Sequence, residues 1–165
     1  MNVQRIAKIL EEKNDLKVRG VILDTAQRKN QIIHGSRAFN IQSPVYLRKE
    51  TKDWDVLTKK PKKYAEQVAE RLSRILGKKV DVIRGKHKGT YKVRINEETI
   101  ADYTQLKHKP KTVSSWGNKI RTLKSIKQNT QRLVKNPKKE FRRGKDIDTL
   151  DRIRQIEEMN KRFSL

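Results

Sequence analysis

The sequence predicts an α/β fold in which a short mixed sheet is flanked by helices. Three observations support this class. Residues 61–76 place apolar side chains at helical spacing, residues 53–57 alternate as a strand does, and three strand-like runs follow between residues 80 and 106. A chain of 165 residues is long enough for one compact domain with a small appended element. We therefore expect a sheet-containing domain over residues 1–109 and a basic helical region over residues 110–165.

The N-terminal part of the chain is expected to be helical before its first strand. The predicted elements are an amphipathic helix over residues 2–13, a second helix over 18–29 that Gly20 weakens, a strand over 31–34, a tight turn at Gly35-Ser36 and a short helix over 37–42. Ser43-Pro44 should stop the short helix, because a residue before proline disfavours the helical conformation. Residues 45–52 are expected to form a loop.

The central part alternates between strands and one long helix. Asp53-Trp54-Asp55-Val56-Leu57 predicts a strand, and the helix over 61–76 should end at Gly77, which suits a helix C-cap. The expected buried stripe of that helix consists of Ala65, Val68, Leu72, Ile75 and Leu76. Strands are then predicted over residues 80–84, 91–95 and 99–106, and the last of these is expected to complete the sheet.

Helices are predicted beyond Pro110. Ser114 or Ser115 is expected to cap a helix that carries Ile120, Leu123 and Ile126 and continues to Leu133 and Val134. Asn136-Pro137 should open a short turn or helix. Asp146 is expected to cap a final helix with Ile147, Leu150, Ile153 and Ile156 on one side.

The chain is strongly basic, with 42 Lys and Arg against 19 Asp and Glu and a formal net charge of +23. Nucleic acid is the commonest partner of such a protein. From Lys107 to Lys145 there are 14 basic residues and one acid, Glu140. The side chains expected to contact a phosphate backbone are Lys119, Arg121, Lys124, Lys138, Lys139, Arg142 and Arg143. Tyr91, Tyr103 and Trp116 are candidates for stacking on bases.

Composition excludes several classes of protein. There is no cysteine, so disulfides, thiolate zinc sites and a cysteine nucleophile are excluded. No apolar run approaches membrane-spanning length, and the first ten residues lack the apolar core of a signal peptide. We therefore expect an intracellular, cytoplasmic protein, or one in the host cytoplasm if it is viral, with no membrane partner.

Asp53 and Asp55 form the constellation that carries chemistry. Residues two apart on a strand point to the same face, so both carboxylates should project together. Two carboxylates that close repel each other unless a cation lies between them, and Mg²⁺ takes oxygen ligands and bridges phosphates. Gly35 would let the backbone approach a phosphate, and Ser36 adds a hydroxyl donor.

These residues resemble the motif of the nucleotidyltransferase superfamily, which includes family X DNA polymerases, poly(A) polymerases and small antitoxin nucleotidyltransferases. The motif is an apolar strand, Gly-Ser, a loop and an Asp-x-Asp with apolar neighbours, and here it is Ile32-Ile33-His34-Gly35-Ser36-Arg37 followed by Asp53-Trp54-Asp55-Val56-Leu57. The resemblance covers about residues 18 to 106. His34 departs from the usual apolar or small residue, and we expect a core histidine there rather than a catalytic one.

The resemblance also implies a ligand set. Gly35, Ser36 and Arg37 would bind a nucleoside triphosphate, and Asp53 and Asp55 would hold two Mg²⁺ (or Mn²⁺) ions with a third aspartate from a neighbouring strand. We prefer Asp102 as the third, because its strand is the last of the hairpin and should reach the sheet centre. Asp81, directly after the long helix, is the alternative.

The predicted activity is transfer of a nucleoside monophosphate from an NTP or dNTP to a hydroxyl, most simply the 3′ hydroxyl of DNA or RNA, with release of pyrophosphate. A protein hydroxyl, as in the antitoxin-type members, is the alternative acceptor. A metal-dependent nuclease that uses Asp81 and Lys86 would leave Gly35-Ser36 unexplained. A non-catalytic nucleic-acid-binding protein would explain the charge but not the aspartates.

Overall fold

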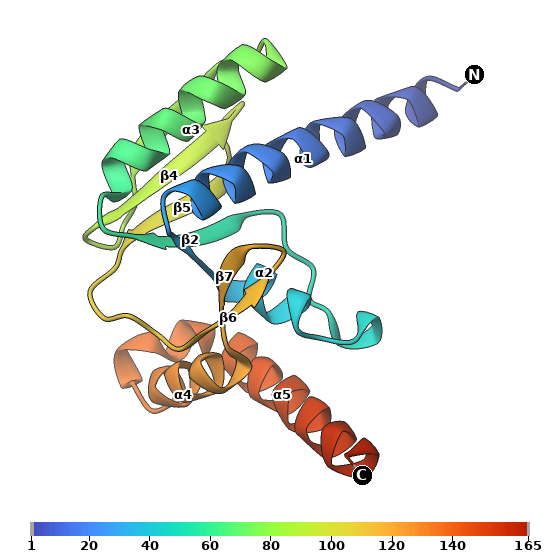
Figure 1. The fold of residues 1–165 in the computed structure, drawn as a ribbon, viewed down its shortest axis with the longest axis vertical. Helices are drawn as coiled ribbons and strands as arrows, with labels where there is room; N and C mark the ends of the chain where they lie inside the picture. The colour runs from blue at the N-terminus through green and yellow to red at the C-terminus, as the bar shows by residue number, and fades with distance from the viewer. Residues whose placement is uncertain (1, 165) are drawn as a thin grey trace.

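A seven-stranded mixed sheet organises the chain, and helices lie on both sides of it (Figure 1). The computed structural model describes residues 2–164. Its elements are α1 (Val3–Arg28), β1 (Ile32–His34), α2 (Gly35–Ile41), η1 (Val45–Leu47), β2 (Trp54–Thr58), α3 (Pro61–Leu76), β3 (Val80–Arg84), β4 (Thr90–Ile95), β5 (Glu98–Gln105), β6 (Thr112–Ser115), β7 (Asn118–Arg121), α4 (Leu123–Val134), η2 (Pro137–Arg142) and α5 (Arg143–Phe163). The predicted α/β class with a mixed sheet is confirmed.

The strand order is β3-β4-β5-β2-β1-β7-β6. β2 is central, because it pairs in parallel with β5 and antiparallel with β1. β1 in turn pairs in parallel with β7, which forms a hairpin with β6 at one edge. The opposite edge is the β3–β4 hairpin. The ends of β1 and β2 therefore lie in the middle of the sheet, where neighbouring strands hold them on both sides.

Alternation along β2 divides its side chains between the two faces of the sheet. Trp54 and Val56 are buried with the core side chains of α1 and α3, while Asp55 is only half-buried. α3 packs on β3, β4 and β5, and α1 lies beside α3 and reaches β7. α4 and α5 pack against each other, and α4 also contacts α2 (Figure 1). Trp54 is thus a core side chain, on the face of the sheet opposite Asp55.

The helix and strands of the central part were predicted closely. α3 begins with Pro61 in its first turn and ends at Gly77, whose φ of +61° is the left-handed C-cap conformation. Ala65, Val68 and Leu72 are buried as expected, but Ile75 is 46 % exposed. Ile75 lies in the last turn, where the helix extends past the sheet it covers. No described helix is both long and apolar enough to cross a membrane.

Two helices were predicted where the structure has one. α1 runs unbroken through Gly20, where an added Cβ would meet no heavy atom within 4 Å. Packing of Val18, Val21 and Ile22 against the core offsets the glycine penalty of roughly 1 kcal/mol. Gly35 and Ser36 are also not a separate turn, because α2 begins at Gly35.

The prediction of a helix capped by Ser114 or Ser115 is wrong. These residues end β6, and a two-residue turn at Trp116-Gly117 leads into β7, where Asn118 and Ile120 are buried in alternation. Residues 99–106 are consequently not the last strand, and the region beyond residue 110 is not wholly helical. The helical part starts with α4, whose N-cap is Thr122.

Asp146 does not cap the final helix. It lies in the first turn of α5, is 2 % exposed, and accepts hydrogen bonds from the Arg142 guanidinium at 2.9 and 3.0 Å. Among its expected apolar partners, Ile153 and Ile156 are buried and Ile147 is 50 % exposed. Asp146 therefore forms a buried ion pair with Arg142 at the start of the helix and does not cap the helix backbone.

Candidate active site

Strand pairing brings the predicted aspartates together on one part of the sheet. In the central strands Asp55 pairs with His34 of β1 and with Asp102 of β5, and Asp53 directly precedes β2. Burial first, and then the negative charges of Asp53 and Asp102, together raise the pKa of Asp55 to about 7. The three carboxylates thus form an electrostatically coupled group with too little compensating charge at Asp55.

Gly35 is fitted closely to Asp55. Its φ is +66°, a conformation that side chains with a Cβ rarely adopt, and a Cβ added there would lie 2.8 Å from Asp55 Cγ. The end of β1 therefore needs glycine for two independent reasons, the backbone conformation and the approach of the carboxylate. Ser36 follows in the first turn of α2.

The two candidates for the third carboxylate have different surroundings. Asp102 lies beside Asp55 and accepts hydrogen bonds from Lys92 Nζ at 2.8 and 2.9 Å. Asp81 lies on the edge strand β3, two strands further out, and is paired with Arg94. The Arg94 guanidinium holds the pKa of Asp81 below its usual range. The structure groups Asp102 with Asp53 and Asp55 and separates Asp81 from them.

A cavity of about 260 Å³ opens between these strand ends and the C-terminal helices. Gly35, Ser36 and Asp55 line it from the sheet, and Asn129 and Thr130 line it from α4. Its basic lining residues are Lys49, Arg121, Arg142 and Lys145. The Asp55 carboxylate at the sheet side and the cations along the walls suit a ligand that carries both phosphates and divalent cations.

Lys49 and Lys145 in this lining were missed by the sequence reasoning. Lys49 lies in a segment predicted only as loop, and Lys145 is in α5, 96 residues further along the chain. Neither position carries a local signal, since no periodicity or spacing relates them to Asp55. Lys92 was missed as well, although a β4 residue opposite Asp102 follows from the hairpin register.

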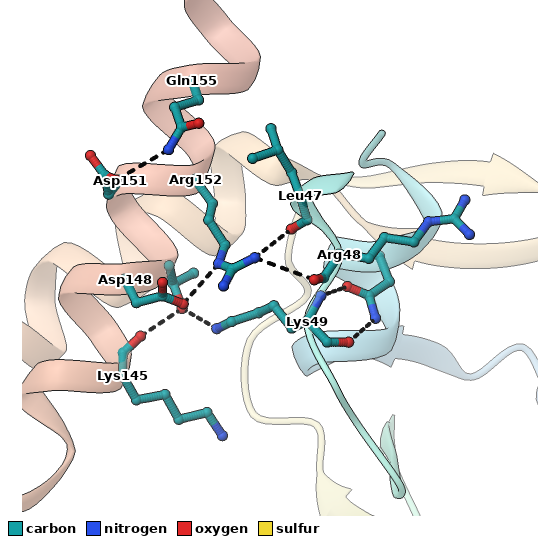
Figure 2. A network of polar contacts seen from close by, with 10 residues as sticks. Leu47, Arg48, Lys49, Lys145, Asp148, Asp151, Arg152 and Gln155 are labelled. Atoms are coloured by element: carbon teal, nitrogen blue, oxygen red, sulfur yellow. Dashed lines mark hydrogen bonds and ion pairs between the residues drawn. The ribbon is translucent and has the colours of Figure 1, made fainter. Parts of the chain in front are cut away.

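α5 is fixed to the loop after η1 by a polar network (Figure 2). Arg152 donates to the backbone carbonyls of Leu47 and Arg48 at 3.1 and 3.2 Å and to the Asp148 carboxylate at 2.9 Å. Lys49 Nζ donates to the Thr149 hydroxyl and lies over the ring of Phe39. Burial lowers the pKa of Lys49. These contacts position the wall that α5 gives to the cavity.

Arg37 and His34 lie next to the candidate carboxylates, and each has a structural environment of its own. Arg37 does not line the cavity. It donates to the carbonyls of Lys52 and Asp53 at 3.2 and 3.3 Å and stacks over the Trp54 ring at 4.7 Å, so it braces the backbone before β2. His34 Nε2 is buried without a partner among the described residues, and burial lowers the pKa of His34 to about 3. His34 is therefore neutral, but it is half-buried and lines the cavity beside Asp55 instead of lying in the core.

The predicted nucleic-acid-contacting residues fall into two groups. Arg121 and Arg142 line the cavity, where Arg121 donates to the Ser125 hydroxyl and Arg142 is held by buried Asp146. The others are exposed or half-buried on the surface of β7, α4, η2 and α5, namely Lys119, Lys124, Lys138, Lys139 and Arg143. Only this second group is available to a long anionic partner without breaking an internal contact.

The donor set for a metal is present but not assembled. Within residues 2–164, no group of three or more His, Cys, Asp or Glu side chains is arranged to hold a metal ion. Lys92 occupies both oxygens of Asp102. The pKa of Asp55 is nevertheless raised in part by repulsion from neighbouring carboxylates, and a cation beside Asp53 and Asp55 would offset this repulsion. The oxygen ligands of Asp53 and Asp55 are of the type that divalent cations prefer, whereas Asp102 is paired with Lys92.

Comparison with known proteins adds evidence from outside the chain. Residues 20–136 match the family model of the poly(A) polymerase catalytic subunit. Among solved structures, the Megavirus polyadenylate synthase superposes with a TM-score of 0.73 and 16% identity, over 91% of this chain and 35% of that one. An antigenic nucleotidyltransferase-like protein from Paracoccidioides brasiliensis gives a TM-score of 0.46 and 14% identity, over 82% and 74%.

No curated protein sequence matches the chain. The chain spans about a third of the length of the Megavirus protein. At 16% identity, that likeness establishes a shared fold.

Gly35→Ala is expected to destabilise the protein by roughly 1–3 kcal/mol, because the new Cβ is strained at positive φ and displaces the Asp55 side chain. Gly20→Ala is the matched control. It lies within α1 in open space, so we expect a gain of roughly 0.5–1 kcal/mol. Chemical denaturation measures both changes. Equal free energies of unfolding for the two variants would contradict the close fit of Gly35 and Asp55.

Asp55→Asn is expected to stabilise the metal-free protein increasingly as the pH rises. The folded pKa of Asp55 is raised to about 7 from its ordinary 3.8. The stability linked to its protonation is therefore fully present below the unfolded pKa and is lost as the pH rises through about 7. Asparagine cannot ionise, so the variant escapes this loss. Melting temperatures in a chelator at several pH values measure it, and a pH-independent difference would count against it.

Proposed function

The chain belongs to the family of poly(A) polymerase catalytic subunits, and from this premise we propose that it is a metal-dependent nucleotidyltransferase that extends the 3′ end of a nucleic acid. The acceptor 3′ hydroxyl attacks the α-phosphorus of a nucleoside triphosphate in line. A new phosphodiester bond forms, the bond to the β-phosphate oxygen breaks, and pyrophosphate leaves. The hydroxyl proton passes to a base or to water.

The observation that carries the proposal is the row of Asp53, Asp55 and Asp102 beside a cavity with basic walls. Asp53 and Asp55 would hold two Mg²⁺ (or Mn²⁺) ions, with Asp102 as a further ligand to the ion near the acceptor. When bound, such ions lower the pKa of the attacking hydroxyl and stabilise charge on the leaving pyrophosphate. Lys92 neutralises Asp102 in the metal-free protein and has to move aside for this ligand to be used.

The cavity suits the triphosphate. Gly35 allows close approach of the backbone, and Ser36 offers a hydroxyl donor on the same side. Lys49, Arg121 and Lys145 supply positive charge from three different parts of the chain. Arg37 would act indirectly, because its hydrogen bonds go to the backbone that carries Asp53. We assign it a positioning role in place of the predicted nucleotide contact.

The exposed cations of residues 107–145 favour nucleic acid over protein as the acceptor. Fourteen basic residues with one acid form a segment whose charge has few internal partners, and phosphate backbones are the common counterpart of such a surface. The nuclease alternative has little support, since Asp81 is paired with Arg94 at the sheet edge.

Asp53→Asn and Asp102→Asn are each expected to reduce nucleotide incorporation by a factor of about 100 or more, because both remove charge that would hold the cations. Asp81→Asn is the matched control and should retain near-normal turnover. Extension of a labelled primer strand with Mg²⁺ and each NTP or dNTP measures the rate. Near-normal turnover of Asp53→Asn, or a comparable loss of turnover in Asp81→Asn, would contradict the assignment of the three aspartates as metal ligands.

The triple variant Lys138→Glu, Lys139→Glu, Arg143→Glu is expected to weaken binding of a primer strand strongly and to flatten its salt dependence, because fewer counterions are released. Arg142 is left intact, since its loss would strand the buried Asp146 carboxylate. The control reverses three exposed lysines on α1, Lys8, Lys13 and Lys17, and changes the net charge equally. Equal weakening by both triples would point to net charge alone, and no weakening by either would favour a protein acceptor.

A further inference from the structure

A second cavity, of about 350 Å³, lies apart from the first and shares no lining residue with it. Its polar and aromatic lining includes Arg19, Arg37, Arg48, Trp54, Trp116 and Asn118. It adjoins the opposite face of the sheet, because Trp54 faces it while the neighbouring Asp55 faces the first cavity. The reaction proposed for the aspartates does not use this cavity.

Trp116 occupies a position that the fold itself does not favour. Ser115 pairs with Asn118, so the β6–β7 turn consists of Trp116 and Gly117 alone, with φ values of +50° and +77°. Both values suit a two-residue turn for which Asn-Gly is the preferred sequence, and a bulky side chain at positive φ is an outlier. The indole is also 95 % exposed and contributes nothing to the core. A strained, exposed tryptophan indicates a role outside folding.

Of the three aromatic residues considered for base stacking, Trp116 alone is available. Tyr103 is fully buried in the core, and Tyr91 is half-buried and packs against it. Trp116 projects from the turn and borders the cavity at the same time. Its ring therefore offers a free face next to an enclosed polar site.

Asn118 supplies an unpartnered polar group in that site. The residue is 5 % exposed, it lines the cavity, and its Oδ1 accepts no hydrogen bond from any described residue. A buried amide oxygen without a hydrogen-bond donor is uncommon in folded proteins and is unfavourable unless a ligand or water donates to it. A ligand with an N–H group at this point would satisfy it.

The charge of the cavity specifies an anionic ligand. Arg19 and Arg48 are both exposed, and neither forms an ion pair with a carboxylate of residues 2–164. No acidic side chain lines the cavity. Aromatic face, hydrogen-bond acceptor and unpaired guanidinium groups together match the base and the phosphate of a nucleotide.

We propose that this cavity binds a nucleotide within a single-stranded nucleic acid, upstream of the 3′ end that the aspartates extend. The base stacks on Trp116 and donates an N–H to Asn118, and the flanking phosphates contact Arg19 and Arg48. The inference rests on the proposed function, to which it adds a second attachment point for the acceptor strand. The site is sequence-tolerant, because every base has a π face and an N–H on its pairing edge.

The start of β2 connects the second cavity with one of the candidate catalytic carboxylates. Trp54 borders the cavity, and Asp53 is its immediate neighbour in the chain. Arg37 joins the two residues, since it stacks on the ring of Trp54 and donates to the carbonyl of Asp53. A strand held at Trp116 would therefore lie near the backbone that carries the catalytic carboxylates.

The test compares Trp116→Asn with the wild type. Asparagine creates the preferred Asn-Gly turn, so the variant should fold with equal or greater thermal stability while it loses the stacking face. Affinity for a fluorescent single-stranded 20-mer is expected to fall about 5- to 150-fold, the range found when one stacked base loses its aromatic partner. Trp116→Phe should restore most of the affinity. Phe163→Asn, which removes another exposed ring from the end of α5, should leave the affinity unchanged.

Further arms separate the possible outcomes. Unchanged affinity in Trp116→Asn, or an equal loss in Phe163→Asn, would overturn the inference. Quenching of Trp116 fluorescence by free ATP at concentrations where the 20-mer does not bind would also overturn it, in favour of a mononucleotide site. If the wild type binds the strand through Trp116 but incorporates no nucleotide, the proposed function fails while the binding site stands.

Discussion

The contact between the Asp55 carboxylate and the Cα of Gly35 is the constraint on which the rest of the site depends. It exists because β1 and β2 pair so that His34 lies opposite Asp55, and the chain leaves β1 at positive φ directly afterwards. Only glycine permits both conditions. The parallel neighbour β5 then places Asp102 beside Asp55, and the chain after Gly35 turns into α2 with Ser36 at the cavity. Carboxylates, cavity and first helix turn are thus fixed by one strand register.

Electrostatics in this protein are arranged by local pairing more than by net charge. The formal charge of +23 does not lower the pKa of Asp55. Burial and the two neighbouring aspartates raise that pKa by more than the nearby cations Lys92 and Lys145 lower it. Conversely, two arginines that net charge alone would suggest for binding nucleic acid have internal partners. Arg142 is paired with Asp146, and Arg37 donates to backbone carbonyls. The free charge lies on exposed side chains of the basic segment and around the second cavity. Binding surface and structural charge must therefore be distinguished residue by residue.

The sequence predicted what depends on neighbours along the chain. The bounds of α3, its Gly77 cap and the β3 strand follow from periodicity and capping, and the strand carrying Asp55 follows from alternation. The β6–β7 hairpin was missed because Trp116-Gly117 replaces the usual Asn-Gly signal and Ser114 resembles a helix cap. The continuity of α1 was missed because tertiary packing outweighs the penalty of Gly20. Lys49, Lys92 and Lys145 depend on contacts between distant segments, and no local pattern encodes such contacts.

Side chains alternate between the two faces of the sheet at the start of β2, over Asp53, Trp54 and Asp55. Asp53 and Asp55 belong to the face that carries Asp102, and Trp54 belongs to the face that carries α1. Because Arg37 stacks on Trp54 and also holds the carbonyls of Lys52 and Asp53, the backbone between the faces is braced from the Trp54 side. The two cavities share no side chain, and Arg37 is the residue that both lines the second cavity and supports the backbone of Asp53.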